Sequence, residues 1–478
     1  MSQVIQRDMT FGSLSSHSAP INKLPIEALM HIFKTYAESY PEDLDQRVVD
    51  LCLVGRHWKA VASSTPQLWT KINLSFPFSS HHLAAALKRV RASRLQEIDV
   101  SIDFRDPDWD GDEPDFDDED TYIPGDHVWV RGIMAVLNGT EGRWRSIKVV
   151  SDDWVPLYEL MDNWRRFTHL SSLESISMKR ANTMFGMRNM PFDPQLLIET
   201  GTLFDRNVSL PRLRDLSLSA VHIDWNDAYT GYQNLRKLEI NNQPYDVGPS
   251  YEEFAAILSS SPRLEYLDVS GFCPDDHTGV PPFPVVHLPA LKELVFGWKE
   301  IGLGCNFLSM FQIGDSLESL TLLDTESGFG YWVDRQTGGR GWREESGEIF
   351  ETICDLGSAV PEDMDDAPFA PFISMRRVKR LRILWTKAAS PSLIPFLAIF
   401  TGLEEVWLED VDEGVLQGVT VSFSSVEEHR PVKRLDFRWK WEQRVPDFAE
   451  PLIPRFEREG VHVVAQAGED WRVGPGQL

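Results

Sequence analysis

Apolar residues recur with helical spacing near the start of the chain. Ile26, Leu29 and Phe33 follow one another at intervals of three and four residues, which predicts a helix that starts near Pro25. A second stripe predicts another helix, and the run from Ser63 to Pro66 predicts its end. Such a small unit buries only a modest core, so we expect it to keep apolar surface for a partner. The first stripe is completed by Ile32 and Tyr36, and the second consists of Leu51, Val54, Trp58 and Val61.

Further along the chain the apolar pattern changes to a short frame of the form L-x-x-L-x-L. Alternation within this frame is typical of a strand with one buried face. Most neighbouring frames start 22 to 29 residues apart, and segments between them, such as Tyr251 to Ser260, have helical spacing. The pattern therefore predicts a parallel sheet built by stacking similar units. The eleven frames start at Leu95, Trp144, Leu173, Leu213, Leu235, Leu264, Leu291, Leu317, Val378, Leu403 and Val432.

The order of motifs in the helical region resembles an F-box, in the form common in fungal proteins. The motifs are Leu24-Pro25-x-Glu27-x-Leu29-x-x-Ile32-Phe33, then Leu53-Val54-x-Arg56-x-Trp58, then Pro66-x-Leu68-Trp69. The sequence departs from the pattern at Gly55, where many members have Ser or Cys. The resemblance implies docking to a Skp adaptor and, through it, to a cullin scaffold. The residues that it implies for adaptor binding are Leu24, Pro25, Glu27, Leu29, Ile32, Phe33, Val54 and Trp58.

The recurring frame resembles an irregular leucine-rich repeat. The expected fold class is therefore α/β, with an N-terminal small helical F-box followed by an irregular leucine-rich-repeat solenoid with a parallel sheet. We expect a disordered N-terminus, the F-box unit and the solenoid, interrupted by two exposed insertions. The first insertion is strongly acidic, and the second is glycine-rich with a hairpin or short helix in its middle. The expected boundaries are 1–20, 21–75 and 76–478, with the insertions at 103–126 and 324–372.

Composition narrows the classes of partner. The 478 residues carry a net charge of -26, which argues against nucleic acid and anionic membranes as the main partners. No apolar run approaches the length needed to span a bilayer, and the N-terminus lacks a signal pattern. The cysteines show no paired spacing, which indicates a reducing compartment, the cytoplasm, the nucleus or both. They are Cys52, Cys273, Cys305 and Cys354.

Two short motifs match part of a calcium-binding loop and part of a serine hydrolase site, but the other residues that these sites need are missing from the expected positions. Asp106 to Asp117 contains the opening of a D-x-D-x-D-G calcium loop, with a proline at a ligand position and Asp where a longer Glu is usual. Gly314 to Leu317 spells the serine block of a lipase and esterase family, but neither His429 nor His462 follows an Asp by three residues. We therefore expect no metal site, no cofactor and no enzymatic activity.

The last frames place a tryptophan among charges on the open face of the sheet. In the frame at Leu403, alternation turns Trp407 away from the core. An exposed Trp flanked by Arg has the composition of a binding hot spot, although opposite charges on adjacent strands can also satisfy one another. The three rows expected across the last strands are Arg380–Glu405–Arg434, Arg382–Trp407–Asp436 and Leu384–Glu409–Arg438. The candidate substrate-binding residues are Arg380, Arg382, Trp407, Arg434 and Arg438.

Together these features predict a substrate-recognition subunit of a cullin-type, SCF-like ubiquitin ligase. The F-box would dock the Skp adaptor, and the repeats would hold a protein substrate that the sequence does not identify. The alternative is a non-catalytic interaction scaffold that has no role in ubiquitination. Copurification of adaptor and cullin distinguishes the two.

Overall fold

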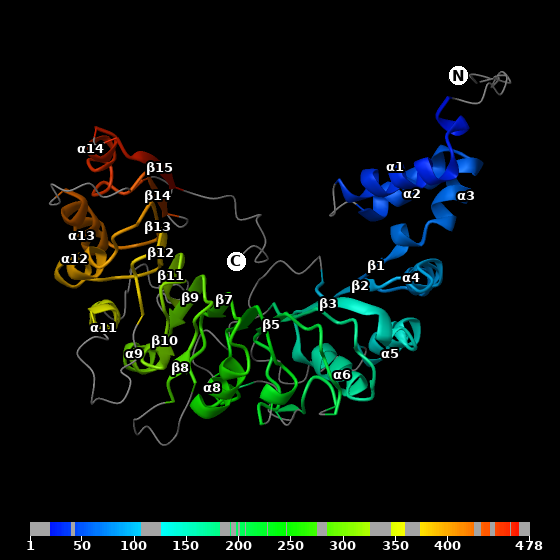
Figure 1. The fold of residues 1–478 in the computed structure, drawn as a ribbon, viewed down its shortest axis with the longest axis horizontal. Helices are drawn as coiled ribbons and strands as arrows, with labels where there is room; N and C mark the ends of the chain where they lie inside the picture. Colours follow the sequence, from blue (N-terminus) through cyan, green and yellow to red (C-terminus); the bar gives the residue numbers. More distant parts are fainter. Residues whose placement is uncertain are drawn as a thin grey trace, which may run out of the picture.

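The chain forms a curved parallel sheet with a small helical unit at its N-terminal end, in a mixed α/β architecture (Figure 1). The structure is a computed structural model. It describes residues 20–39, 44–106, 126–181, 192, 197–198, 201–205, 207–226, 228–244, 246–274, 284–325, 346–358, 373–424, 432–439, 445–458 and 460–467.

The helical unit contains three α-helices that pack around a core of their own. Its buried residues include two from each predicted stripe and Leu68 from the motif that follows them; the four stripe residues are Leu29, Phe33, Leu51 and Val61. The second stripe is divided, because one helix ends at Val54 and the next begins at Arg56. The elements are η1 (Pro20–Lys23), α1 (Ile26–Glu38), α2 (Leu44–Val54), α3 (Arg56–Ser64) and η3 (Pro66–Trp69).

In the described residues, thirteen strands form one sheet, in which all pairs are parallel and the strands follow chain order. Two further strands, β8 and β10, form a separate parallel pair. Eleven of these strands correspond to the predicted frames, and β1 and β15 extend the sheet at its two ends. Their bounds are β1 (Lys71–Ser75), β2 (Ile98–Asp103), β3 (Trp144–Ser151), β4 (Ser175–Arg180), β5 (Asp215–Ser219), β6 (Lys237–Asn241), β7 (Tyr266–Val269), β9 (Glu293–Trp298), β11 (Ser319–Asp324), β12 (Arg380–Leu384), β13 (Glu405–Glu409), β14 (Arg434–Trp439) and β15 (His462–Ala467); the separate pair is β8 (Val286–His287) with β10 (Phe311–Gln312).

The apolar positions of the frames form one continuous core beneath the sheet. In the frame of β6, for example, Leu235 before the strand and Leu238 and Ile240 within it are all fully buried. The first frame is an exception, since Leu95 is 90% exposed, contrary to the prediction. Arg94 has a φ of 54°, in the left-handed region, and this turn directs the chain so that Leu95 points outward.

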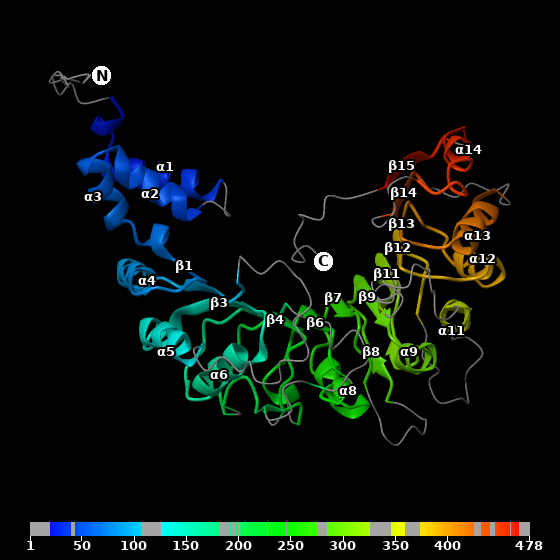
Figure 2. The same cartoon turned by 180° about the vertical axis from the view of Figure 1, so that it is seen from behind.

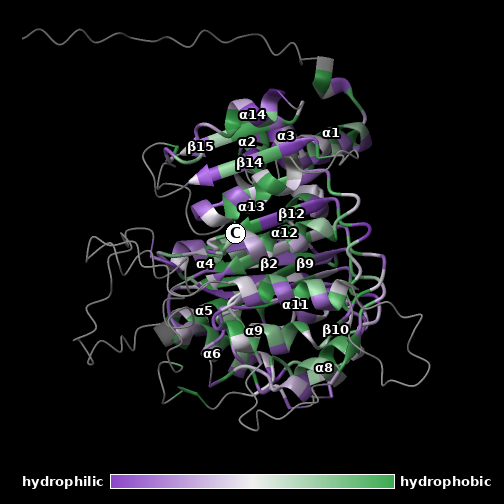
Figure 3. Cartoon of the chain, turned by 90° about the vertical axis from the view of Figure 1, so that its left-hand side faces the viewer, coloured by the Kyte–Doolittle hydropathy of each residue, from purple (hydrophilic) through white to green (hydrophobic). Residues whose placement is uncertain are grey.

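The described helices lie on one side of the sheet, and no helix of the described residues covers its other face, called the open face below (Figures 1 and 2). Viewed along the stack, hydrophobic and hydrophilic residues alternate within strands and helices, as expected for elements with one buried face (Figure 3). The strand side chains that point away from the core therefore lie on the open face, and many of them are polar. The helices are α4 (Ser80–Ala92), α5 (Asp126–Leu137), α6 (Trp154–Trp164), α8 (Tyr251–Ser259), α9 (Ile301–Leu308), α11 (Gly347–Ser358), α12 (Ser390–Ala398), α13 (Glu413–Ser424) and α14 (Ile453–Arg458), with short 3-10 turns η4 (Glu141–Arg143) and η6 (Ala228–Thr230).

Several strands are followed directly by a residue with left-handed backbone geometry. Ala220, Asn242, Trp385 and Asp410 each follow a strand directly and have φ between 46° and 55°. Each of their N–H groups donates a hydrogen bond to a carbonyl at the end of the next strand, at 2.8 to 3.0 Å. This turn continues the hydrogen-bond ladder beyond the strands while it directs the chain toward the helical side. Only Asn and Asp among these residues commonly adopt such a geometry.

The predicted insertions are described only in part. Of the acidic stretch, residues 107–125 lie outside the described residues, as do residues 1–19 of the N-terminus. Within the second insertion, α11 is not an exposed excursion, since Ile349, Phe350 and Ile353 are fully buried. Their helical spacing explains this packing, which the glycines and acidic residues on either side obscured. Residues 326–345 and 359–372 lie outside the described residues.

Candidate functional site

The helical unit exposes apolar side chains that its own core does not use. Leu53 and Val54, at the end of α2, are 75% and 61% exposed. A small domain gains stability by burying such residues, so their exposure indicates a surface that another molecule covers. Further exposed apolar side chains of this unit are Leu24, Ile26, Ile32, Tyr36 and Val49.

The eight predicted adaptor-binding residues divide into surface and core. Leu24, Pro25, Glu27, Ile32 and Val54 are exposed, so they are available to a partner. By contrast, Leu29 and Phe33 are completely buried, so they support the unit from inside and cannot form its contact surface.

Trp58 lies between these two classes. It is partly buried, and its ring centroid lies 4.9 Å from that of Phe33. Trp69 packs against the same core, and its Nε1 donates a hydrogen bond of 2.9 Å to the carbonyl of Ala62. Leu53 and Ile26 are exposed apolar residues that the sequence prediction did not include for adaptor binding. Leu53 lies outside the predicted stripes, which could have identified it as a surface residue, whereas Ile26 belongs to the first predicted stripe and is nevertheless exposed.

The second candidate surface is the open face formed by β12, β13 and β14. The pairing places Arg380, Glu405 and Arg434 opposite one another, as the alignment of the frames predicted. The other two predicted rows are also formed, Arg382–Trp407–Asp436 and Leu384–Glu409–Arg438. The L-x-x-L-x-L frame is therefore sufficient to fix the register of these three strands.

Trp407 is held between two arginines on this face. The guanidinium carbon of Arg382 lies 4.8 Å from the ring centroid of Trp407, and that of Arg438 lies 4.0 Å from it. Both distances fall within the range of cation–π attraction. Trp407 is partly buried, as are both arginines, so the stack is pre-ordered and still reaches solvent.

One opposite-charge pair of this face is not joined across the strands. Arg380 and Glu405 are exposed neighbours in register, yet no ion pair joins them in the described part of the chain. Arg434 instead pairs along its own strand with Asp436, at 2.9 Å. Among the described residues, the side chains of Arg380 and Arg382 form no hydrogen bond or ion pair.

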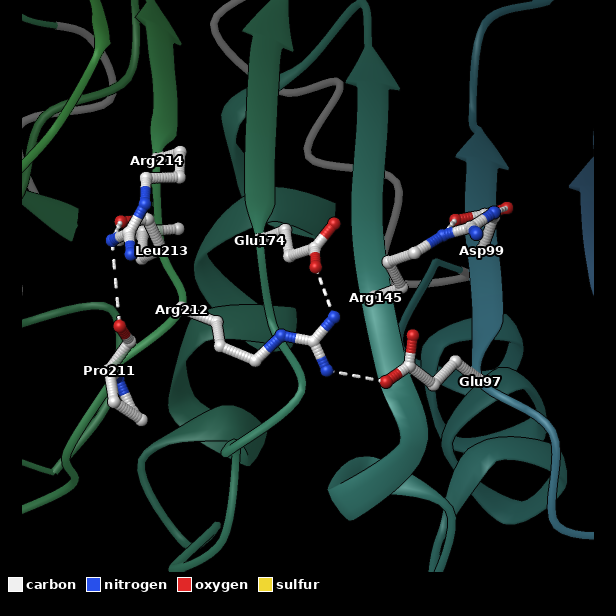
Figure 4. A network of polar contacts seen from close by, with 8 residues as sticks. All are labelled: Glu97, Asp99, Arg145, Glu174, Pro211, Arg212, Leu213 and Arg214. Carbon is white, nitrogen blue, oxygen red and sulfur yellow. Dashed lines mark hydrogen bonds and ion pairs between the residues drawn. The ribbon is translucent and has the colours of Figure 1, made fainter.

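Near the opposite end of the sheet, arginines form ion pairs with carboxylates of neighbouring strands and loops (Figure 4). There Arg212 reaches between Glu174 and Glu97 and forms ion pairs with both carboxylates. Arg145 likewise pairs with Asp99, to which its Nε donates at 3.0 Å. These guanidinium groups are satisfied within the protein, so this region holds neighbouring units together and has fewer free donors to offer.

The middle of the open face contains perturbed acids. Burial raises the pKa of Asp268 to about 6, although hydrogen bonds from Ser270 and Asn241 oppose the change. Burial also raises the pKa of Tyr266, whose ring accepts the Lys237 ammonium group at 4.8 Å. The hydrogen bonds to Asp268 and the contact of Lys237 with Tyr266 are thus formed within the face itself.

Ser316, the serine of the apparent esterase motif, lies in the turn before β11. Its neighbour Asp315 accepts a hydrogen bond from the hydroxyl of Ser374. Among the described helices, none is long and apolar enough to cross a membrane.

Comparison with known proteins identifies the helical region. Residues 21–75 match the family model described as F-box-like, which confirms the resemblance of this region. A comparison with curated proteins found no match. F-box domains in general bind Skp-type adaptors within SCF-type ubiquitin ligases. The matched residues end with β1, which pairs with β2, so the domain is continuous with the sheet. The chain therefore carries an F-box-like domain, formed by its helical unit and the first strand of the sheet.

Proposed function

We propose that this protein is a substrate-recognition subunit of an SCF-like ubiquitin ligase. Its F-box-like domain docks a Skp-type adaptor, which joins it to a cullin scaffold. The open face of the curved sheet holds a target protein. Support comes from the family match over residues 21–75 and from the apolar surface that this domain leaves uncovered.

The proposal extends to the architecture and origin of the chain. The sheet is a leucine-rich-repeat-like solenoid, and the protein is of the fungal F-box type. Support for the solenoid comes from the recurring frame and from thirteen parallel strands in chain order within the described residues. A polar open face on such a sheet is a suitable binding platform.

In this role the chain catalyses no step itself. It raises the local concentration of a target lysine beside a conjugating enzyme that other subunits carry, which is catalysis by proximity. It needs no cofactor or metal, and it works in the cytoplasm, the nucleus or both.

The observation that carries the proposal is the exposure of Leu53 and Val54 on an F-box-like domain. The test is capture of a purified Skp-type adaptor by the full-length chain and by Leu53→Asp with Val54→Asp. We expect this double variant to lose capture, because two charges would be buried at an apolar contact. A matched control is Leu95→Asp with Val421→Asp, two exposed apolar residues outside the domain.

The result separates three outcomes. Capture by wild type and by the control, but not by the Leu53 and Val54 variant, supports the proposal, and cullin then copurifies with the adaptor. Adaptor capture without cullin indicates a scaffold. If wild-type protein captures no adaptor, the proposed function is wrong.

A further inference from the structure

We propose that the turn leading into β12 binds an acidic segment of the target protein, through four cations that the chain does not pair internally. This proposal rests on the receptor function proposed above and names the chemistry of its target. Three of the cations lie before the strand, and the fourth is its first residue. They are Arg376, Arg377, Lys379 and Arg380, called the basic turn below.

All four side chains of the basic turn are available to a ligand. Each is exposed, and none forms a hydrogen bond or an ion pair in the described part of the chain. The backbone that carries them is fixed, because the N–H of Lys379 donates to the carbonyl of Glu318 at 2.9 Å. Met375 and Val378 are buried and anchor the turn in the core. A ligand therefore meets charges on an ordered backbone, which lowers the entropic cost of binding.

Other cations at this edge of the sheet, where the strands begin, are paired with acids. The ammonium group of Lys292 donates to Glu265 at 2.6 Å, and that of Lys433 donates to Glu404 at 2.7 Å. Arg212, nearer the N-terminal end of the sheet, also forms ion pairs. The basic turn differs from these positions because its four neighbouring cations lie together without such a partner among the described residues.

The acids near the basic turn do not neutralise it. Glu318 and Glu405 are exposed on the two strands beside β12 or just before them, yet neither forms an ion pair with the basic turn in the described residues. Glu404 is occupied by Lys433, whose hydrogen bond lowers the pKa of this carboxyl group. An acidic ligand therefore does not have to displace an internal carboxylate from these cations.

The basic turn is continuous with the open face of the sheet. Two residues beyond Arg380 on β12, the guanidinium carbon of Arg382 lies 4.8 Å from the ring centroid of Trp407. A segment that binds the basic turn and continues along β12 thus reaches a partly exposed tryptophan. A large aromatic residue beside charges is typical of a binding hot spot, so the same segment gains an apolar contact there.

The charge of the whole protein favours a short acidic segment over a long polyanion. With a net charge of -26, most of the surface repels acidic ligands, so a short segment has few competing positions. A nucleic acid would extend its phosphates beyond the basic turn onto this acidic surface. The acidic segment of a protein can confine its charges to the basic turn.

The test is fluorescence anisotropy of a labelled, glutamate-rich peptide titrated with full-length protein at low salt. The comparison probes are the same peptide with glutamine in place of glutamate and a single-stranded DNA of similar length. We expect the glutamate peptide to bind and the glutamine peptide to bind at least about tenfold more weakly, because it lacks the charges. Binding of the glutamate peptide should weaken as salt is added, since salt screens exposed charges.

The variant that tests the site replaces all four cations of the basic turn with glutamine and should lose at least about tenfold in affinity. The control replaces four exposed cations on or beside helices and changes the net charge by the same amount, so it should bind nearly as wild type does. A milder variant, Arg376→Gln with Arg377→Gln, leaves β12 unchanged and should lose about threefold. The control substitutions are Lys88→Gln, Arg91→Gln, Arg131→Gln and Arg166→Gln.

Adaptor capture and melting temperature, measured on the same proteins, separate this proposal from the proposed function. Loss of peptide binding in both basic-turn variants, with adaptor capture and melting temperature retained, supports the site. The proposal is overturned if wild type does not bind the glutamate peptide, if it binds both peptides equally, or if the control variant loses as much affinity. Tighter binding of the DNA than of the glutamate peptide also overturns it and indicates a nucleic-acid partner.

Discussion

The F-box-like domain and the curved sheet offer two different kinds of surface. The domain exposes apolar side chains such as Leu53, whereas the sheet exposes arginines around a partly buried Trp407. Apolar contacts give affinity without strong directionality, and charged planar groups give orientation and selectivity. In the proposed function, a constant partner covers the domain and the sheet discriminates among targets.

The two regions also differ in how their cores are built. The helical unit has a separate core of eight buried residues, while the sheet and its helices share one continuous core from Ile72 to Phe456. A small core loses a larger fraction of its stability with each lost side chain. We therefore expect the two regions to respond differently to the same kind of change.

The largest expected effect is local unfolding of the helical unit by Phe33→Ala. Removal of this completely buried ring should cost about 3–5 kcal/mol, which is comparable to the total stability of so small a core. Amide hydrogen exchange should rise across α1 to α3 while the sheet stays protected.

Phe254→Ala is the matched control, since Phe254 is equally buried in α8 and contacts Phe272 and Phe307. There exchange should rise across neighbouring units and leave the helical unit unchanged. If Phe33→Ala loosened the sheet to the same extent, the two cores would be one cooperative unit.

A smaller loss of stability is expected when the pH is lowered, and it should affect only the large core of the sheet and its helices. His222 is buried against Trp154 and Phe192, and its Nε2 lies 2.9 Å from the carbonyl of Ile198. Burial lowers the pKa of His222 to about 4, with Arg180 adding to this and Asp246 opposing it. The ordinary value of 6.5 holds in the unfolded chain, so the unfolded state binds the extra proton first, and stability falls as pH drops from about 6.5 to 4.

Between pH 6.5 and 5 the sheet should lose about 2 kcal/mol through this residue. Urea unfolding of wild type and His222→Phe at the two pH values measures the loss. The variant should lose about 2 kcal/mol less over this interval, whatever its stability at pH 6.5. An identical pH dependence in both proteins would mean that His222 titrates normally in the fold.

Next in size is Trp407→Ala, which should lower the free energy of unfolding by about 1–2 kcal/mol. It removes a partly exposed ring and two cation–π contacts. Trp298→Ala is the buried counterpart on the same sheet and should cost about 3–5 kcal/mol. Chemical denaturation compares the two, and equal losses would assign Trp407 to the core instead of to a binding surface.

The smallest expected effect is a gain from Arg94→Gly. Arg94 is exposed and has a left-handed φ of 54°, so glycine should relieve backbone strain and stabilise the protein by about 0.5 kcal/mol. Arg91→Gly, within the last turn of α4, should instead destabilise by about 1 kcal/mol. A loss of stability in Arg94→Gly would show that its side chain outweighs the backbone strain.

Much of the sheet was decided by local pattern. Alternation with period two fixes which residues of a strand are buried, so the frames alone predicted the register that joins Arg382, Trp407 and Asp436. The F-box motifs were likewise local in sequence, and the family match over residues 21–75 confirms them. The sequence also shows that Leu53 lies outside the apolar stripe of its helix, although it was not included among the predicted adaptor-binding residues.

The tertiary structure decided what depends on distances between side chains. Pattern placed Arg434 opposite Glu405, but the side chain pairs with Asp436 on its own strand. The exposure of Leu95 depends on the turn at Arg94, and the burial of α11 depends on its neighbours in the stack. Sequence periodicity determines the face on which a residue lies, whereas rotamers, turns and packing partners determine what it contacts there.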